Sequence, residues 1–456
     1  MKNTERLMEE KHFIADHLSE ILPTLSEQDF DLLKGFADIE AIEDESFIKR
    51  AVEGFENRLF VQEKDRFDQD AKRVLVAVND TGAYRAVKSL IANLQKDDRC
   101  RSVAVVTGGV SNKFFPADFG IDFQEVRTTD QPFMVDLLSY SKDQPFDIVI
   151  GSVSYINGPE SLALVGKENF GASKTFLIFE GWASGMGSGV DMVKDKEAGN
   201  VAVSNFDGIF CNPGGLAKKI IKTHLPDFSE NKIFETGTPN LDDMDIGNRE
   251  QLRQSGRQKL GLVDKDFSVL FWGDYSAYPE YDADPLINQK TFEETLLSLI
   301  DLAKDNPNYQ FAFLFRPHPG GGNDKYGFGE IVAKFQAPSN LKVVSASKQV
   351  VGLNEAAYSA DVSTGIISTE HILGPLRGSW SVYLGYKEDT GDKVFEGFFP
   401  EKIRKEIMNT KGISITESAK DLTTTIKNLV QNPDLRPSPV ILPGKSADRI
   451  LNKIFE

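Results

Sequence analysis

The sequence contains little cysteine and no long hydrophobic run, and each absence excludes a class of protein. The two cysteines, Cys100 and Cys211, are far apart and have no second thiol or histidine at metal-ligand spacing, so we expect two half-buried thiols, no disulfide framework and no bound metal. No apolar run approaches the roughly 18 residues of a membrane span, and the N-terminal segment lacks the apolar stretch of a secretory signal. These features predict a cytoplasmic protein without a transmembrane segment.

Positive charge is also scarce. The chain has 52 lysines and arginines against 69 aspartates and glutamates, a formal net charge of −17. Long-range repulsion therefore opposes binding to nucleic acid or to an anionic membrane surface. A small anionic substrate would need a local positive pocket, and the search for a site starts from that requirement.

The length of the chain and a change of apolar period indicate several structural units. A chain of 456 residues is too long for one ordinary core. Residues 1–70 have apolar positions three and four apart, which predicts short amphipathic helices. This N-terminal helical segment could cap the next domain, mediate homo-oligomer formation or contact a partner protein, and the pattern does not choose between these roles.

From Arg73 onward, short apolar runs alternate with segments of helical spacing, as in RVLVAVN followed by DTGAYRAVKSLIANLQ and SVAVVTGG. Strands of such continuous apolar character are typical of a parallel sheet covered on both faces. The pattern predicts an α/β fold of two Rossmann-like domains facing a cleft, over 71–245 and 262–430, joined between Thr238 and Leu262. Residues 431–456 are expected to form a C-terminal helical tail.

The strongest chemical signal follows the apolar run FAFLF. Arg316 and His318 alternate along an extended segment, and Gly320 and Gly321 follow, allowing close approach to a ligand. In doubly wound sheets, ligands bind beyond the carboxyl ends of the strands. A guanidinium offers forked donors to phosphate oxygens, and an imidazole can add a hydrogen bond or a charge. The alternative is that both side chains simply hold a tight loop.

A second signal is the hydroxyl-rich segment DVSTGIISTEH, which precedes a helical pattern. Unpaired N–H groups at a helix start, aided by hydroxyls, bind phosphate without net positive charge, although simple helix capping gives the same pattern. The candidate binding residues here are Ser363, Thr364, Gly365, Ser368, Thr369 and Glu370.

RPHPGG followed by STGIISTEH, on successive strand ends, resembles the C-terminal domain of the GT-B superfamily, which contains nucleotide-sugar glycosyltransferases and UDP-N-acetylglucosamine 2-epimerases. Residues 73–245 resemble its acceptor domain. The resemblance implies that His318 contacts the donor phosphate, that the 363–369 turn surrounds it, and that Glu370 faces the ribose or sugar. It implies a nucleotide-sugar donor, a saccharide, lipid-linked or protein acceptor, and no other cofactor.

Two carboxylates compete for the role of catalytic base in the first domain. Glu180 ends the strand TFLIF and resembles the place where the epimerases carry an active-site Glu, whereas Asp80 follows RVLVAVN. Either could take a proton from an acceptor hydroxyl. Helix capping by Glu180 and turn formation by Asp80 are the structural alternatives, and we favour Glu180.

The leading functional hypothesis is therefore a metal-independent glycosyltransferase. The first strand is not followed by GxGxxG, which disfavours hydride transfer. A nucleotide-sugar epimerase or hydrolase is the alternative, but the chain has Gly151-Ser152-Val153-Ser154 where the epimerases place Gly-Asp-Thr. A third hypothesis is a catalytically silent scaffold subunit, which would bind no nucleotide.

Overall fold

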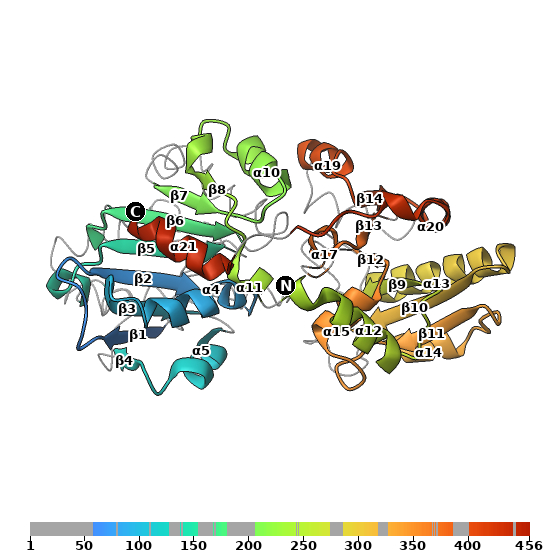
Figure 1. The fold of residues 1–456 in the computed structure, drawn as a ribbon, viewed down its shortest axis with the longest axis horizontal. Helices are drawn as coiled ribbons and strands as arrows, with labels where there is room; N and C mark the ends of the chain where they lie inside the picture. Colours follow the sequence, from blue (N-terminus) through green and yellow to red (C-terminus); the bar gives the residue numbers. More distant parts are fainter. Residues whose placement is uncertain are drawn as a thin grey trace, which may run out of the picture.

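The fold is that of a computed structural model, and element labels follow Figure 1. The structure describes residues 58–78, 81–108, 111–126, 140–153, 170–179, 206–242, 246–273, 286–317, 327–366, 373–385, 401–440 and 444–456, with the single residues Leu137, Lys167, Met244, Ser368 and Glu370. The segment 1–57, predicted to be helical, lies outside these residues.

In the described part of the first half, the strands form one eight-stranded sheet in the order β4-β1-β3-β2-β5-β6-β7-β8. The strands are β1 (Arg58–Glu63), β2 (Lys72–Val78), β3 (Cys100–Thr107), β4 (Gln124–Val126), β5 (Ile148–Val153), β6 (Lys174–Phe179), β7 (Gly208–Phe210) and β8 (Ile233–Phe234). From β3 to β8 all neighbours are parallel. The chain reverses direction across the sheet between β2 and β5, where a ligand crevice is expected at the carboxyl ends.

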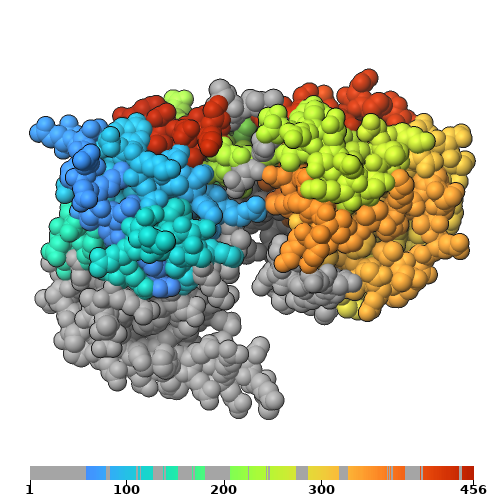
Figure 2. Space-filling model, turned by 60° about the horizontal axis from the view of Figure 1, so that its bottom comes forward, coloured from blue at the N-terminus to red at the C-terminus, as the bar shows by residue number. Residues whose placement is uncertain are grey.

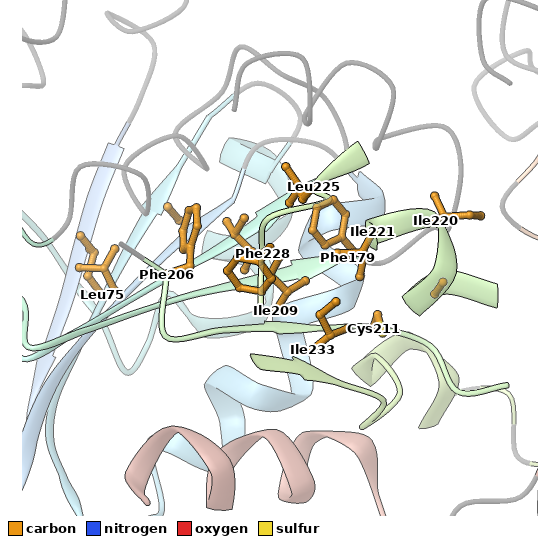
Figure 3. Close-up of a cluster of buried hydrophobic side chains, with 14 of the residues drawn as sticks. Leu75, Phe179, Phe206, Ile209, Cys211, Ile220, Ile221, Leu225, Phe228 and Ile233 are labelled. Carbon is orange, nitrogen blue, oxygen red and sulfur yellow. The ribbon is translucent and has the colours of Figure 1, made fainter. Parts of the chain in front are cut away.

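Helices cover both faces of this sheet because its parallel strands are apolar on both sides. They are α4 (Thr81–Leu94), α5 (Ser111–Phe119) and α10 (Leu216–His224), with a 3₁₀ turn η4 (Glu230–Lys232). Figure 3 shows the core on the α10 face, where Ile220, Ile221 and Leu225 pack with Leu75 and Ile209. The other face packs against α4 and α5.

The helical prediction for 1–70 was wrong at its C-terminal end. Residues 58–63 form strand β1, which pairs antiparallel with β3 from Arg58↔Thr107 to Glu63↔Ser102. Leu59, Phe60 and Val61 are buried in succession, so both faces of the segment are covered. A short apolar run of this kind has no distinctive periodicity, and pairing with the edge of β3 decides its conformation.

In the described part of the second half, six parallel strands form a sheet in the order β11-β10-β9-β12-β13-β14. The strands are β9 (Asp266–Trp272), β10 (Gln310–Arg316), β11 (Leu341–Ser345), β12 (Val362–Gly365), β13 (Trp380–Leu384) and β14 (Ile413–Thr416). The helices are α13 (Ile287–Asp305), α14 (Phe328–Ala333), α15 (Leu353–Ser359), α17 (Gly374–Arg377), α19 (Glu401–Met408) and α20 (Ala419–Gln431), with η8 (Pro433–Leu435). This is the strand order of a dinucleotide-type Rossmann sheet, with its reversal between β9 and β12. The α/β prediction of two Rossmann-like domains is confirmed.

The chain passes between the two sheets twice. The forward connection contains α11 (Pro239–Asp242), η5 (Ile246–Asn248) and α12 (Arg249–Lys259), and the return leads to α21 (Ser446–Phe455). Helix α21 lies over the first sheet in Figure 1, and its Ile450 and Ile454 belong to a buried core cluster of that sheet. The Asp242 carboxylate accepts the N–H groups of Ser446 (2.7 Å) and Ala447, which caps α21 and fastens the two connections together.

Both cysteines are more deeply buried than predicted. Cys100 and Cys211 are fully buried rather than half-buried, on β3 and directly after β7. Burial raises the pKa of the Cys100 thiol to about 12 and also raises the pKa of Cys211. Both therefore act as small apolar core residues. None of the described helices has the length and apolarity of a membrane span.

Candidate functional site

Three strand ends meet at the carboxyl edge of the second sheet. Arg316 at the end of β10 pairs in register with Trp272 at the end of β9, and Thr364 of β12 pairs with Phe271. Arg316 and Gly365 therefore flank Trp272 on neighbouring strands, about 10 Å apart at the usual strand spacing. The strand order brings together two segments that the sequence separates by nearly fifty residues.

Arg316 is a buried cation held by the backbone. Only 9% of the residue is exposed, and its Nη1 donates to the carbonyl oxygens of Ala346 (2.6 Å) and Val351 (3.0 Å). Burial lowers the pKa of Arg316, and attraction from Glu370 partly opposes that shift. Within the described part of the chain, no carboxylate lies within 4.0 Å of its guanidinium. Buried charges are normally paired, and here two backbone carbonyls and the more distant Glu370 face this cation.

The hydroxyls of Ser363 and Thr364 are engaged inside the sheet. Trp272 Nε1 donates to Ser363 Oγ at 2.7 Å, and Thr364 Oγ1 donates to the carbonyl oxygen of Val382 at 2.8 Å. Both residues are buried. These side chains therefore fix the positions of β9, β12 and β13, and this part of the turn presents mainly backbone to the edge of the sheet.

Gly365 allows β12 and β9 to approach closely at their ends. A Cβ atom at this position would lie 2.8 Å from the carbonyl oxygen of Trp272, a distance that real Cβ atoms do not show. Only glycine fits without shifting one of the strands.

We expect Gly365→Ala to destabilise the protein by about 1–3 kcal/mol, because the added methyl forces backbone apart in a packed sheet. Urea unfolding measures the effect. Gly247→Ala is the matched control, because a Cβ at Gly247 meets nothing within 4 Å. Equal unfolding midpoints for Gly365→Ala and the wild type would show that β12 has room at this position.

Glu370 is surrounded by arginines from both domains. Its Oε2 accepts from Arg377 Nη2 at 2.6 Å, and its backbone carbonyl accepts from Arg377 Nη1 at 3.2 Å. Its Oε1 lies 4.0 Å from Nη1 of Arg85, on helix α4 of the first domain. Arg377 is almost fully buried, whereas 16% of the Glu370 side chain is exposed. Glu370 therefore joins the second domain's strand-end site to the first domain.

A second contact also joins the domains. Lys219 of α10 forms an ion pair of 3.6 Å with Glu406 of α19, and Ile407 belongs to the same core cluster as Ile220. Figure 2 shows the two halves as separate lobes with a hollow between them. Arg85 and Glu370, which approach each other near the carboxyl ends of the strands, therefore come from opposite lobes.

Several predicted site residues lie outside the described residues. They are Asp80, Glu180, His318, Gly320, Gly321 and Thr369. In the sequence, Asp80 follows the end of β2 by two positions, Glu180 directly follows β6, and His318 follows β10 by two positions. Ser368 is described and half-buried. Their roles remain predictions.

Sequence reasoning missed Arg85 and Arg377. Arg85 lies near the start of the helix that follows β2, at the predicted crevice, so its position in the βαβ unit was an available signal. Arg377 follows Glu370 by seven residues on a short helix and carried no such signal.

The end of β5 carries a buried hydroxyl. Ser152 Oγ donates to the carbonyl oxygen of Ala83. Residues 151–153 contain no carboxylate.

Comparison with known proteins identifies the fold. No protein-family model matches the sequence, and no curated protein matches it significantly. Among solved structures, the chain is similar to the UDP-GlcNAc 2-epimerase of Neisseria meningitidis bound to UDP-GlcNAc, with a TM-score of 0.54 and 12% identity over 84% of this chain and 99% of that one. A putative UDP-N-acetylglucosamine 2-epimerase of Listeria monocytogenes (TM-score 0.52, 12% identity, 84% and 96% covered) and S. aureus MnaA with UDP (0.52, 13%, 84% and 96%) are also similar. The chain therefore has the GT-B fold, as its strand-end motifs predicted.

Proposed function

We propose that this protein is a glycosyltransferase that binds a nucleotide-activated sugar in its second domain and transfers the sugar to an acceptor held by the first. The observation that carries the proposal is Arg316, a buried guanidinium at the carboxyl edge of the sheet with no described carboxylate within 4.0 Å. It ends β10, the neighbour of β9, and the strand order reverses between β9 and β12. In a chain with a net charge of −17, such a site supplies the local positive charge that a phosphate needs. The similar structures that contain UDP or UDP-GlcNAc support the same ligand class.

The proposed reaction uses cations to stabilise the leaving group. The bond between the anomeric carbon and the donor phosphate oxygen breaks, and a bond from that carbon to the acceptor oxygen forms. In an inverting transfer, the proton of the acceptor hydroxyl passes to a first-domain carboxylate, Glu180 or Asp80. Arg316 and His318 stabilise the negative charge that develops on the departing phosphate, so the step needs no metal ion.

A nucleotide-sugar epimerase or hydrolase is the second candidate, favoured by the fold of the similar structures. Against it, residues 151–153 at the end of β5 contain no carboxylate, whereas the resemblance to the epimerases calls for an Asp there. A glycosyltransferase and an epimerase or hydrolase would bind the donor in the same way. Their reactions differ because only the glycosyltransferase needs an acceptor.

Titration calorimetry with CMP-, UDP-, GDP- and CDP-linked sugars tests the ligand class. We expect one base series to bind. Incubation of the bound donor alone then separates the candidates: an epimerase or hydrolase changes it, whereas a glycosyltransferase requires a saccharide, lipid-linked or protein acceptor. A protein that binds none of the compounds would be the scaffold subunit of the third hypothesis.

Substitution of His318 tests the phosphate assignment once a donor is known. His318→Ala should lower the transfer rate far more than it lowers the unfolding midpoint, because the imidazole is proposed to act on the leaving group. Unchanged transfer rates in purified H318A protein would show that the phosphate lies elsewhere.

A further inference from the structure

One cation of the first domain faces the second domain's site. Helix α4 carries Arg85 and Lys88 on successive turns, and Lys88 Nζ pairs with Asp118 of the neighbouring α5 at 2.9 Å. Tyr84 also donates its hydroxyl proton to Asp118. Arg85 instead approaches Glu370 across the domain boundary. The start of α4 therefore directs a guanidinium toward the second domain.

The two arginines on Glu370 differ in how firmly they are held. Arg377 is 2% exposed and donates at 2.6 Å, so its bond to Oε2 is a fixed part of the second domain. The Arg85 side chain is 45% exposed, and its 4.0 Å distance to Oε1 exceeds a hydrogen bond. Exposed ion pairs of this length contribute little to stability. Arg85 can therefore exchange Glu370 for another anion at small cost.

The turn that carries Glu370 is anchored to the connection between the domains. Leu373 and the neighbouring Leu376 of α17 pack in one cluster with Leu241 and Met244 of the forward connection. Helix α11 of that connection also packs against α4. The Glu370 end of the pair is thus held by buried contacts, and the exposed Arg85 guanidinium is the end that can change partner.

We propose that Arg85 binds the second phosphate of a nucleoside diphosphate substrate, leaving Glu370 when the substrate enters. The inference rests on the proposed function and deepens it, because it names the substrate class as diphosphate rather than monophosphate. Arg316 from one lobe and Arg85 from the other supply two guanidiniums, one positive charge for each phosphate group. Glu370, freed at Oε1, becomes available to accept from a ribose hydroxyl.

Calorimetry on the full-length protein tests this role with UDP, GDP, CDP and CMP as probes and the corresponding nucleosides as references. Arg85→Gln should weaken the best-binding nucleoside diphosphate about tenfold and flatten the salt dependence of its affinity, since one charge-assisted contact is lost. Affinity for the nucleoside should not change. Arg101→Gln is the matched control, since it makes the same change at an exposed arginine. Arg101 lies at the start of β3, where its guanidinium packs over Phe67.

Four outcomes would overturn the inference. If Arg85→Gln and the wild type bind the diphosphate with equal affinity, Arg85 does not contact the phosphate. If Arg85→Gln weakens nucleoside binding as much as diphosphate binding, the effect of the substitution is structural. Binding of CMP in preference to every diphosphate, unaffected by Arg85→Gln, contradicts the diphosphate class but leaves the proposed function standing. If the wild type binds no nucleotide, the proposed function fails and this inference fails with it.

Discussion

Arg316→Met is expected to lower the affinity for the nucleotide ligand about 100-fold. A charge-assisted hydrogen bond contributes about 1.5–3 kcal/mol, and every 1.4 kcal/mol corresponds to a factor of ten in the dissociation constant. Methionine fills similar apolar space but cannot donate to phosphate. The loss should appear for the nucleotide and not for the nucleoside, as measured by calorimetry.

The same substitution has a smaller effect on stability. The carbonyl oxygens of Ala346 and Val351 lose a donor, which costs about 1–3 kcal/mol, but removal of a buried cation offsets part of this cost. Arg316→Lys keeps the charge without the fork and should give an intermediate affinity. If Arg316→Met binds nucleotide as tightly as the wild type, the buried guanidinium serves only to hold the loop, which is the structural alternative that the sequence left open.

Asp361→Ala should lower the free energy of unfolding by about 1–3 kcal/mol, because it leaves the buried backbone N–H of Ser268 without an acceptor and unpairs two partly exposed arginines. The Asp361 side chain is 2% exposed, and its Oδ1 accepts from Arg253 at 2.7 Å and from Arg436 at 2.5 Å. Its Oδ2 accepts the backbone N–H of Ser268 at 2.8 Å. The first arginine lies on the forward connection and the second on the return, so one carboxylate fastens both to β12.

Urea unfolding with a fitted slope measures this change. Asp264→Ala is the control, because Asp264 is an exposed carboxylate in the turn before β9 and its removal should change the free energy of unfolding by less than about 0.5 kcal/mol. Asp361→Asn keeps the shape of the side chain and some of its hydrogen bonds. Its loss of unfolding free energy should therefore lie between those of Asp361→Ala and Asp264→Ala. A loss below about 1 kcal/mol for Asp361→Ala would mean that the arginines find other partners and that the connections are held elsewhere.

Residue pattern alone was sufficient for the two-sheet architecture. Runs such as VLVAV and FAFLF are apolar at every position because both faces of a parallel strand are covered, so the fold class follows from local composition. The rule that ligands meet the carboxyl ends of strands then indicated Arg316 and Glu370. It did not require the strand order, because every parallel strand ends at the same edge.

Tertiary structure decided what the side chains at that edge contact. Ser363 and Thr364 are hydroxyl residues suited to a phosphate, yet their partners Trp272 and Val382 are set by which strands are neighbours. Residues 58–63 were predicted helical and form a strand because the edge of β3 is available for pairing. Neither outcome is encoded within the segment itself.

The candidate site also separates what the sequence predicts from what the tertiary structure decides. The sequence by itself predicted that an anionic substrate would need a local positive site and proposed Arg316 for it, since both predictions depend on charge and on a strand end. Only the tertiary structure brought Arg85 and Arg377 to Glu370, because Arg85 belongs to the other domain and reaches Glu370 when the two lobes are joined. Contacts between distant segments depend on how the domains pack, and no local pattern carries that information.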